Sequence, residues 1–129
     1  MAEQLMIQLF ILQTIDYLLV ALEKVELEAI MDQISTRNQL IALNGNDDPQ
    51  LIYLSHRKGW NCHDEELNDE QFIQKLIDKN CDFFVLHQPS RLSLSPTLQE
   101  LPTVYQDPHF LIQMNTKLKI YRRFEIQLL

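Results

Sequence analysis

Glycine is scarce in this chain, which has only Gly45 and Gly59 in 129 residues. The phosphate-binding P-loop and the Gly-x-Gly-x-x-Gly turn of dinucleotide-binding folds both need closely spaced glycines, so the sequence excludes both. It also lacks the Gly-x-Ser-x-Gly turn that presents the nucleophile of many hydrolases. The sequence therefore predicts no cofactor.

Cysteine is equally rare, and Cys62 and Cys81 do not form a Cys-x-x-Cys pair. This spacing excludes the usual zinc and thioredoxin-like motifs. Cys62, His63 and Asp64 could begin a metal site, but no second motif with metal-ligand spacing completes it, and no metal is predicted. Cys62 and His63 are also no nucleophile–base pair, because sequence neighbours rarely point at each other. We predict no catalytic residues, a buried Cys81, and a Cys62–Cys81 disulfide only in an oxidising compartment.

Positive charge is in short supply, with 11 basic against 18 acidic residues and a net charge of -7. An acidic domain binds polyphosphate poorly, so nucleic acid is not a predicted partner. The hydrophobic content of 46% is that of an ordinary globular protein, and the length suits one domain. Acidic residues gather in 61–70 and basic residues in 117–123, which we interpret as solvated faces.

Neither glycine nor proline occurs before residue 45, and apolar spacing predicts a helix over residues 4–34. Its first part, residues 5–22, is rich in large apolar side chains but contains Gln8, Gln13, Thr14 and Asp16. Two interpretations fit: the segment is a buried or partner-facing helix, or it is the last part of a membrane helix or a membrane-proximal segment. No basic region precedes it, so it does not resemble a signal peptide. We therefore divide the chain into an apolar helix, 1–24, and an α/β domain, 25–129.

The rest of the chain alternates between strand and helix patterns. Short apolar runs predict parallel central strands at 39–43 and 81–87. Between them we expect a helix from Asp48 and Pro49 to Lys58, stopped by Gly59, and another that begins at Asn68 with Gln71 in a capping box. A short helix over 96–101, a hairpin of 103–105 with 110–114 and a strand at 118–128 follow. The predicted fold is a single-domain α/β open sheet with central parallel strands, flanking helices and a C-terminal antiparallel hairpin.

The loop and helix after the first predicted strand hold the candidate ligand-binding residues, because ligands of open α/β sheets bind beyond the carboxyl ends of strands. These candidates are Asn46, Asp47, Asp48, Tyr53, His56, Arg57, Lys58 and Trp60. Carboxylates at a helix start oppose a phosphate and favour a neutral sugar, on which Trp60 could stack. Helical spacing also predicts that Tyr53, His56 and Arg57 meet on one face. The structural alternative is that Asp48 caps a helix, Tyr53 and Trp60 pack on the sheet, and Arg57 pairs with an acidic neighbour.

Residues 25–114 also resemble a known family, most specifically in the segment from Asp48 to Trp60. It is similar to the soluble extracytoplasmic C-terminal domain of membrane-embedded glycosyltransferases of the dolichyl-phosphate-mannose–protein mannosyltransferase-like and aminoarabinose transferase-like group. The matching residues are Asp48, Pro49, Leu51, Ile52, Tyr53, Arg57, Lys58, Gly59 and Trp60, with weaker matches in 82–85 and 104–112. Catalysis in this family belongs to the membrane part, so the resemblance implies an accessory domain.

Three functional hypotheses compete at this point. The first is a non-catalytic accessory domain that positions an acceptor or a lipid-linked sugar donor, on the extracytoplasmic face of a membrane and against a membrane or membrane-protein partner. The second is a protein–protein interaction domain that forms a homodimer through its N-terminal helix, and such a free-standing protein would be cytoplasmic. The third is a small hydrolase, which ranks last because neither a nucleophile nor a metal set is present.

Overall fold

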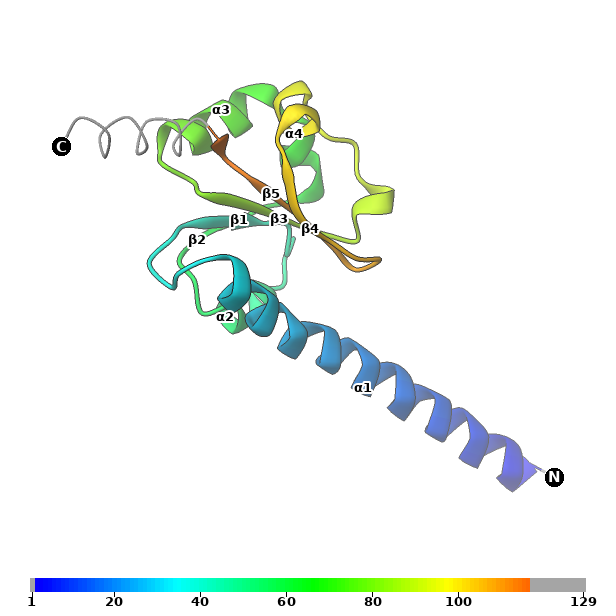
Figure 1. The fold of residues 1–129 in the computed structure, drawn as a ribbon. Helices are drawn as coiled ribbons and strands as arrows, with labels where there is room; N and C mark the ends of the chain where they lie inside the picture. Colours follow the sequence, from blue (N-terminus) through cyan, green and yellow to red (C-terminus); the bar gives the residue numbers. More distant parts are fainter. Residues whose placement is uncertain (1, 117–129) are drawn as a thin grey trace.

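The computed structural model describes residues 2–116, with the side chains of 3–15 and 26–116, and it contains one mixed five-stranded sheet between two layers of helices (Figure 1). The strand order is β2-β1-β3-β5-β4. Helices α1 and α2 lie on one face of the sheet, and α3 and α4 lie on the other (Figure 1). The predicted α/β open sheet is confirmed, whereas the strand predicted at 118–128 lies outside the described residues.

The sheet combines a parallel half with an antiparallel half. β1 (Ile41–Leu43) pairs in parallel with β2 (Gly59–Asn61) and with β3 (Phe83–His87). β5 (Phe110–Met114) runs antiparallel to β3 and to β4 (Thr103–Gln106), which is the predicted hairpin. The prediction that the apolar runs at 39–43 and 81–87 form adjacent parallel strands is therefore confirmed.

Both faces of the central strands are buried, which explains why their sequences are almost continuously apolar. Ile41, Leu43 and Phe83 belong to the core cluster beneath α1 and α2. Ala42 and Phe84 point the other way, into the cluster beneath α3 and α4. Since strand residues alternate between faces, one short strand supplies both cores.

The helices are α1 (Ala2–Ile34), α2 (Gln50–Leu54), α3 (Glu70–Asp78) and α4 (Pro96–Glu100), with short 3₁₀ helices η1 (Asp64–Asn68) and η2 (Pro89–Arg91). The prediction of a helix over 48–58 is wrong in length, because α2 ends at Leu54 and His56 adopts a left-handed φ of 54°. The predicted cap at Asn68 is also wrong: Asp69 accepts hydrogen bonds from the backbone N–H groups of Gln71 and Phe72.

The chain has an apolar arm, residues 3–15 of α1, that projects away from the sheet (Figure 1). Every described side chain of the arm is exposed, including Met6 at 72% and Phe10 at 70%. Among the side chains described at the other end of the helix, Leu27, Ile30 and Met31 enter the core. None of the helices within residues 2–116 combines the length and apolar character needed to cross a membrane.

Candidate functional site

The three parallel strands end at the same edge of the sheet, and polar residues follow each of them. Asn44 comes directly after β1, Asp64 lies three residues beyond β2, and Gln88 comes directly after β3. The predicted Asn46, Asp47 and Asp48 lie in the loop after β1. We call the set Asn44, Asn46, Asn61, Asp64 and Arg91 the carboxyl-edge network.

Asn44 is the buried centre of this network, with 1% of its surface exposed. Its Oδ1 accepts from the backbone N–H of His87 at 2.6 Å, and its Nδ2 donates to the His87 carbonyl at 3.0 Å. The side chain thereby continues the β1–β3 pairing beyond the strand end. Nδ2 also donates to Oδ1 of Asp64 at 2.8 Å, which joins the strand ends to η1.

Asn46 and Asn61 connect the loop after β1 to β2. Asn46 Nδ2 donates to Asp64 Oδ1 at 3.2 Å, and its Oδ1 accepts from the Asp64 backbone N–H at 2.9 Å. Asn61 Oδ1 accepts from the Gly45 N–H at 2.9 Å, while its Nδ2 donates to the Asn46 carbonyl at 3.2 Å. Asn46 has a left-handed φ of 55°, a conformation that asparagine tolerates better than most residues.

Charged groups border the network on its solvent side. Arg91 lies 3.3 Å from Asp64 Oδ2, and His63 Nε2 lies 3.6 Å from an Asp47 carboxylate that is itself 99% exposed. The edge therefore contains side-chain amides that bond to one another and to Asp64, and its exposed groups are the Asp47 carboxylate and, in part, the Arg91 guanidinium and the Asp64 carboxylate. Such groups can hydrogen-bond to hydroxyls of a neutral polar ligand, whereas the carboxylates oppose a phosphate. Among the described side chains, those of residues 3–15 and 26–116, no group of three or more His, Cys, Asp or Glu is arranged to hold a metal ion.

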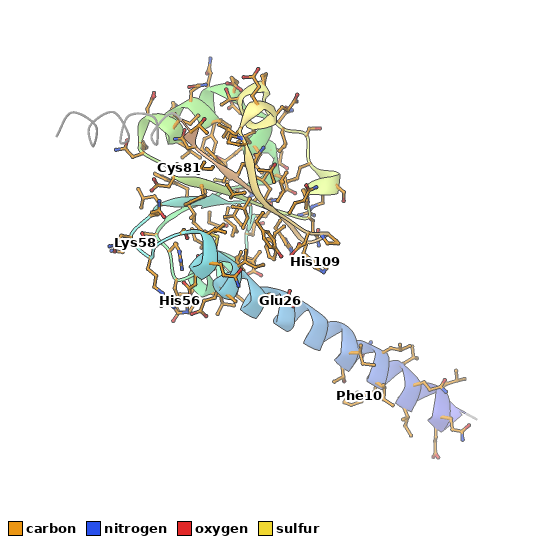
Figure 2. The ribbon with its side chains drawn as sticks, viewed as in Figure 1. Phe10, Glu26, His56, Lys58, Cys81 and His109 are labelled. Atoms are coloured by element: carbon orange, nitrogen blue, oxygen red, sulfur yellow. The ribbon has the colours of Figure 1, made fainter. Side chains whose placement is uncertain are left out.

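The other predicted candidates lie away from this edge. Arg57 is buried against α1, where its Nη1 contacts Asp32 at 2.9 Å. Tyr53 is 78% exposed on α2, and Lys58 lies at the surface (Figure 2). The prediction that Tyr53, His56 and Arg57 meet on one helix face is wrong, because α2 ends before His56 and the next residue turns inward.

Trp60 lies on the opposite side of the sheet from α2. It is half-buried and packs against the cluster beneath α3 and α4, next to its strand partner Ala42. Trp60 therefore does not lie beside Tyr53 and Arg57. The structural alternative to ligand binding predicted that Trp60 packs on the sheet and that Arg57 pairs with an acidic residue, and the structure shows both contacts.

Both cysteines are buried, free thiols in the cluster beneath α3 and α4. Burial raises the pKa of Cys62 to about 12, and burial also raises the pKa of Cys81 strongly. At neutral pH both are therefore protonated and poor nucleophiles. Figure 2 places Cys81 inside the body of the domain.

Comparisons with known proteins give no relative. No protein-family model, no curated protein and no solved structure matches the chain. Among the structural features, the carboxyl-edge network and the apolar arm are therefore the ones on which a functional proposal can be based.

Proposed function

We propose that this chain is a non-catalytic α/β accessory domain of a membrane glycosyltransferase-like protein. The apolar arm is the observation that carries the proposal. Its large side chains are exposed at Leu5, Met6, Ile7, Leu9, Phe10, Ile11, Leu12 and Ile15. No charged residue occurs between Glu3 and Asp16. A helix that exposes so many large apolar side chains needs an apolar environment around it, which a membrane or a membrane protein supplies.

In this proposal the arm attaches the domain to the membrane part of the protein, and the carboxyl-edge network binds a sugar of the acceptor or the lipid-linked donor. Two features of the carboxyl edge support a sugar as its ligand. The edge holds several side-chain amides beside Asp64, and the exposed Asp47 disfavours a phosphate there. The resemblance of residues 48–60 adds the extracytoplasmic side of the membrane as the location.

Vesicle flotation tests the attachment. The full chain should float with phosphatidylcholine vesicles, because the arm loses its contact with water when it enters them. The double variant Met6→Gln/Phe10→Gln should float much less, and Tyr53→Gln, which changes an equally exposed aromatic residue on α2, should float like the original chain. Equal flotation of all three proteins would contradict the attachment.

Binding of a lipid-linked sugar tests the carboxyl edge. A short-chain polyprenyl-phosphate hexose in detergent should shift the backbone amide signals of Gly45, Asn46 and Asp64. The same polyprenyl phosphate without the hexose is the control and should leave these signals in place. If the two lipids shift the same signals, the edge does not recognise the sugar.

Self-association is the second candidate, and one observation favours it. Leu5, Leu9 and Leu12 are spaced by four and then three residues, as in the seam of a coiled coil. Sedimentation without lipid distinguishes the candidates. A dimer that Leu9→Gln converts to a monomer would support self-association, whereas a monomer that still floats with vesicles would support the accessory domain.

A further inference from the structure

A small set of polar contacts around the buried Arg57 side chain joins the end of α1 to the turn after α2. The set consists of Asp32 and Ser35 at the end of α1, and Ser55 and Arg57 after α2; we call it the Arg57 joint. The Arg57 side chain is 0% exposed, so its charge is shielded from water on every side. A buried guanidinium must have its donors satisfied by nearby acceptors.

Four contacts satisfy the Arg57 guanidinium, and three of them reach α1 or the residue after it. Nη1 lies 2.9 Å from Asp32 Oδ1 and donates to the Ser55 carbonyl at 2.9 Å. Nε donates to Ser35 Oγ at 3.2 Å, and Nη2 donates to the Ser35 carbonyl at 3.1 Å. The planar guanidinium fixes the directions of all these donors together, so the contacts restrict rotation as well as distance.

The backbone turn before Arg57 directs the Arg57 side chain towards α1. His56 adopts a left-handed φ of 54°, which is unfavourable for a residue that carries a Cβ atom. Ser55 stabilises this turn, because its Oγ donates to the Ile52 carbonyl at 2.6 Å and accepts from the Arg57 N–H at 3.3 Å. The turn sends His56 outward and Arg57 inward.

A second layer of charge surrounds the joint at the surface. Arg37 Nη2 lies 3.1 Å from both Glu28 Oε1 and Asp32 Oδ2, and His56 Nε2 lies 3.4 Å from the same Glu28 oxygen. Glu28 and Asp32 are four residues apart and share one face of α1. Arg37, which follows α1, and His56, in the turn after α2, therefore both contact this face, and Figure 2 shows His56 at the place where α1 meets the body.

We propose that the Arg57 joint is an orientation lock, which sets the angle between the apolar arm and the sheet. The apolar contacts of Leu27, Ile30 and Met31 hold the last turns of α1 on the domain, but apolar contacts are non-directional. The directional hydrogen bonds of Arg57 supply the angle. This role is independent of what the arm binds, and it places Arg57 among the positioning residues and not among ligand-binding ones.

Pulsed electron paramagnetic resonance on the full chain in detergent tests the lock. Spin labels at Gln13→Cys on the arm and Lys75→Cys on α3 report the angle as a distance distribution. Both native thiols are buried and so protected from labelling. The unmodified joint should give one narrow distribution, and Asp32→Asn should widen it roughly twofold, because hinge motion replaces a fixed angle. Asp78→Asn, an exposed aspartate on α3, is the matched control and should leave the width unchanged.

Ser35→Ala provides a milder second variant, because it removes only the Oγ acceptor of Arg57. It should widen the distribution less than Asp32→Asn while circular dichroism reports an intact domain. A distribution that is already broad with the original joint, or one that keeps its width in both variants, would overturn the lock. Loss of the folded domain in both variants would also overturn it, because the contacts would then hold the sheet together and not the arm.

Discussion

Gly59 lies directly opposite Ile41 in the parallel pairing of β2 with β1, so closely that a Cβ atom at position 59 would collide with the Ile41 carbonyl oxygen. Its φ of 152° is also one that residues with a Cβ atom rarely adopt. Gly59 is therefore needed for strand contact, and not for the helix end to which the sequence pattern assigned it.

Replacing this glycine should disrupt the edge strand. Gly59→Ala should lower the free energy of unfolding by about 3 kcal/mol, because it adds backbone strain and a steric clash together. Urea denaturation measures the change. Lys58→Ala at the exposed neighbouring position should change the stability by less than about 0.5 kcal/mol. Equal effects of the two substitutions would contradict the predicted close contact.

Asn44 should be the most sensitive residue of the carboxyl-edge network. Asn44→Ala removes three hydrogen bonds from a buried position and should cost about 3 kcal/mol of stability. The His87 amide should also exchange its hydrogen faster, because it loses Asn44 Oδ1 as an acceptor. Asn68→Ala, on an exposed asparagine of η1, is the control. A cost as small as that of the control would show that the edge is not held by Asn44.

Glu70 connects α3 to α4 and should make the stability depend on acidic pH. The Thr97 hydroxyl, followed by Gln74 Nε2 and the Thr97 N–H, donates to its carboxylate and lowers the pKa of Glu70 from 4.5 to about 2. A lowered pKa in the folded state stabilises the protein above the ordinary pKa, and the contribution is lost as the pH falls from about 4.5 towards 2. Urea unfolding across this range should therefore show a steeper loss for the original chain than for Glu70→Gln. Glu65→Gln, on an exposed glutamate, should keep the steep profile; parallel profiles for all three proteins would exclude the role of Glu70.

Removal of residues 1–14 should leave the α/β domain folded, because their described side chains bury nothing in either core. Near-ultraviolet circular dichroism should keep its native signal. A longer deletion of residues 1–31 should unfold the domain, since it removes Leu27, Ile30 and Met31, each of which contributes about 2–5 kcal/mol. If the short deletion also unfolds the chain, the arm is part of the core.

The fold could be predicted from the sequence where local patterns decide it. The apolar runs of β1 and β3, the Ser95–Pro96 start of α4 and the β4–β5 hairpin have clear signals of length, capping and turn residues. β2 was missed because its three residues have no apolar pattern, and only pairing with β1 makes them a strand. The early end of α2 was missed because His56 takes a left-handed conformation without a glycine.

The candidate site could be predicted only in part for the same reason. The loop after β1 was recognised through its position behind an apolar run. Asn61 is the last residue of the unrecognised β2, Asp64 follows that strand, and Arg91 comes from a 3₁₀ helix whose place depends on the whole sheet. Arg57 was predicted as a ligand-binding candidate, and the sequence pattern could not show that it contacts Ser35, 22 residues earlier and directly after α1, and Asp32, 25 residues earlier in α1.

Because α1 is long, a small rotation at the Arg57 joint produces a large displacement at the other end of the helix. Asp32 and Phe10 are separated by 22 helical positions, which correspond to ~33 Å along the axis. A rotation of about 10° at Arg57 would therefore displace Phe10 by ~6 Å, given the ~1.5 Å rise per residue. Substitutions at the joint can thus change the melting temperature of the domain only slightly and still change the position of the far end of α1 relative to the sheet by several ångströms.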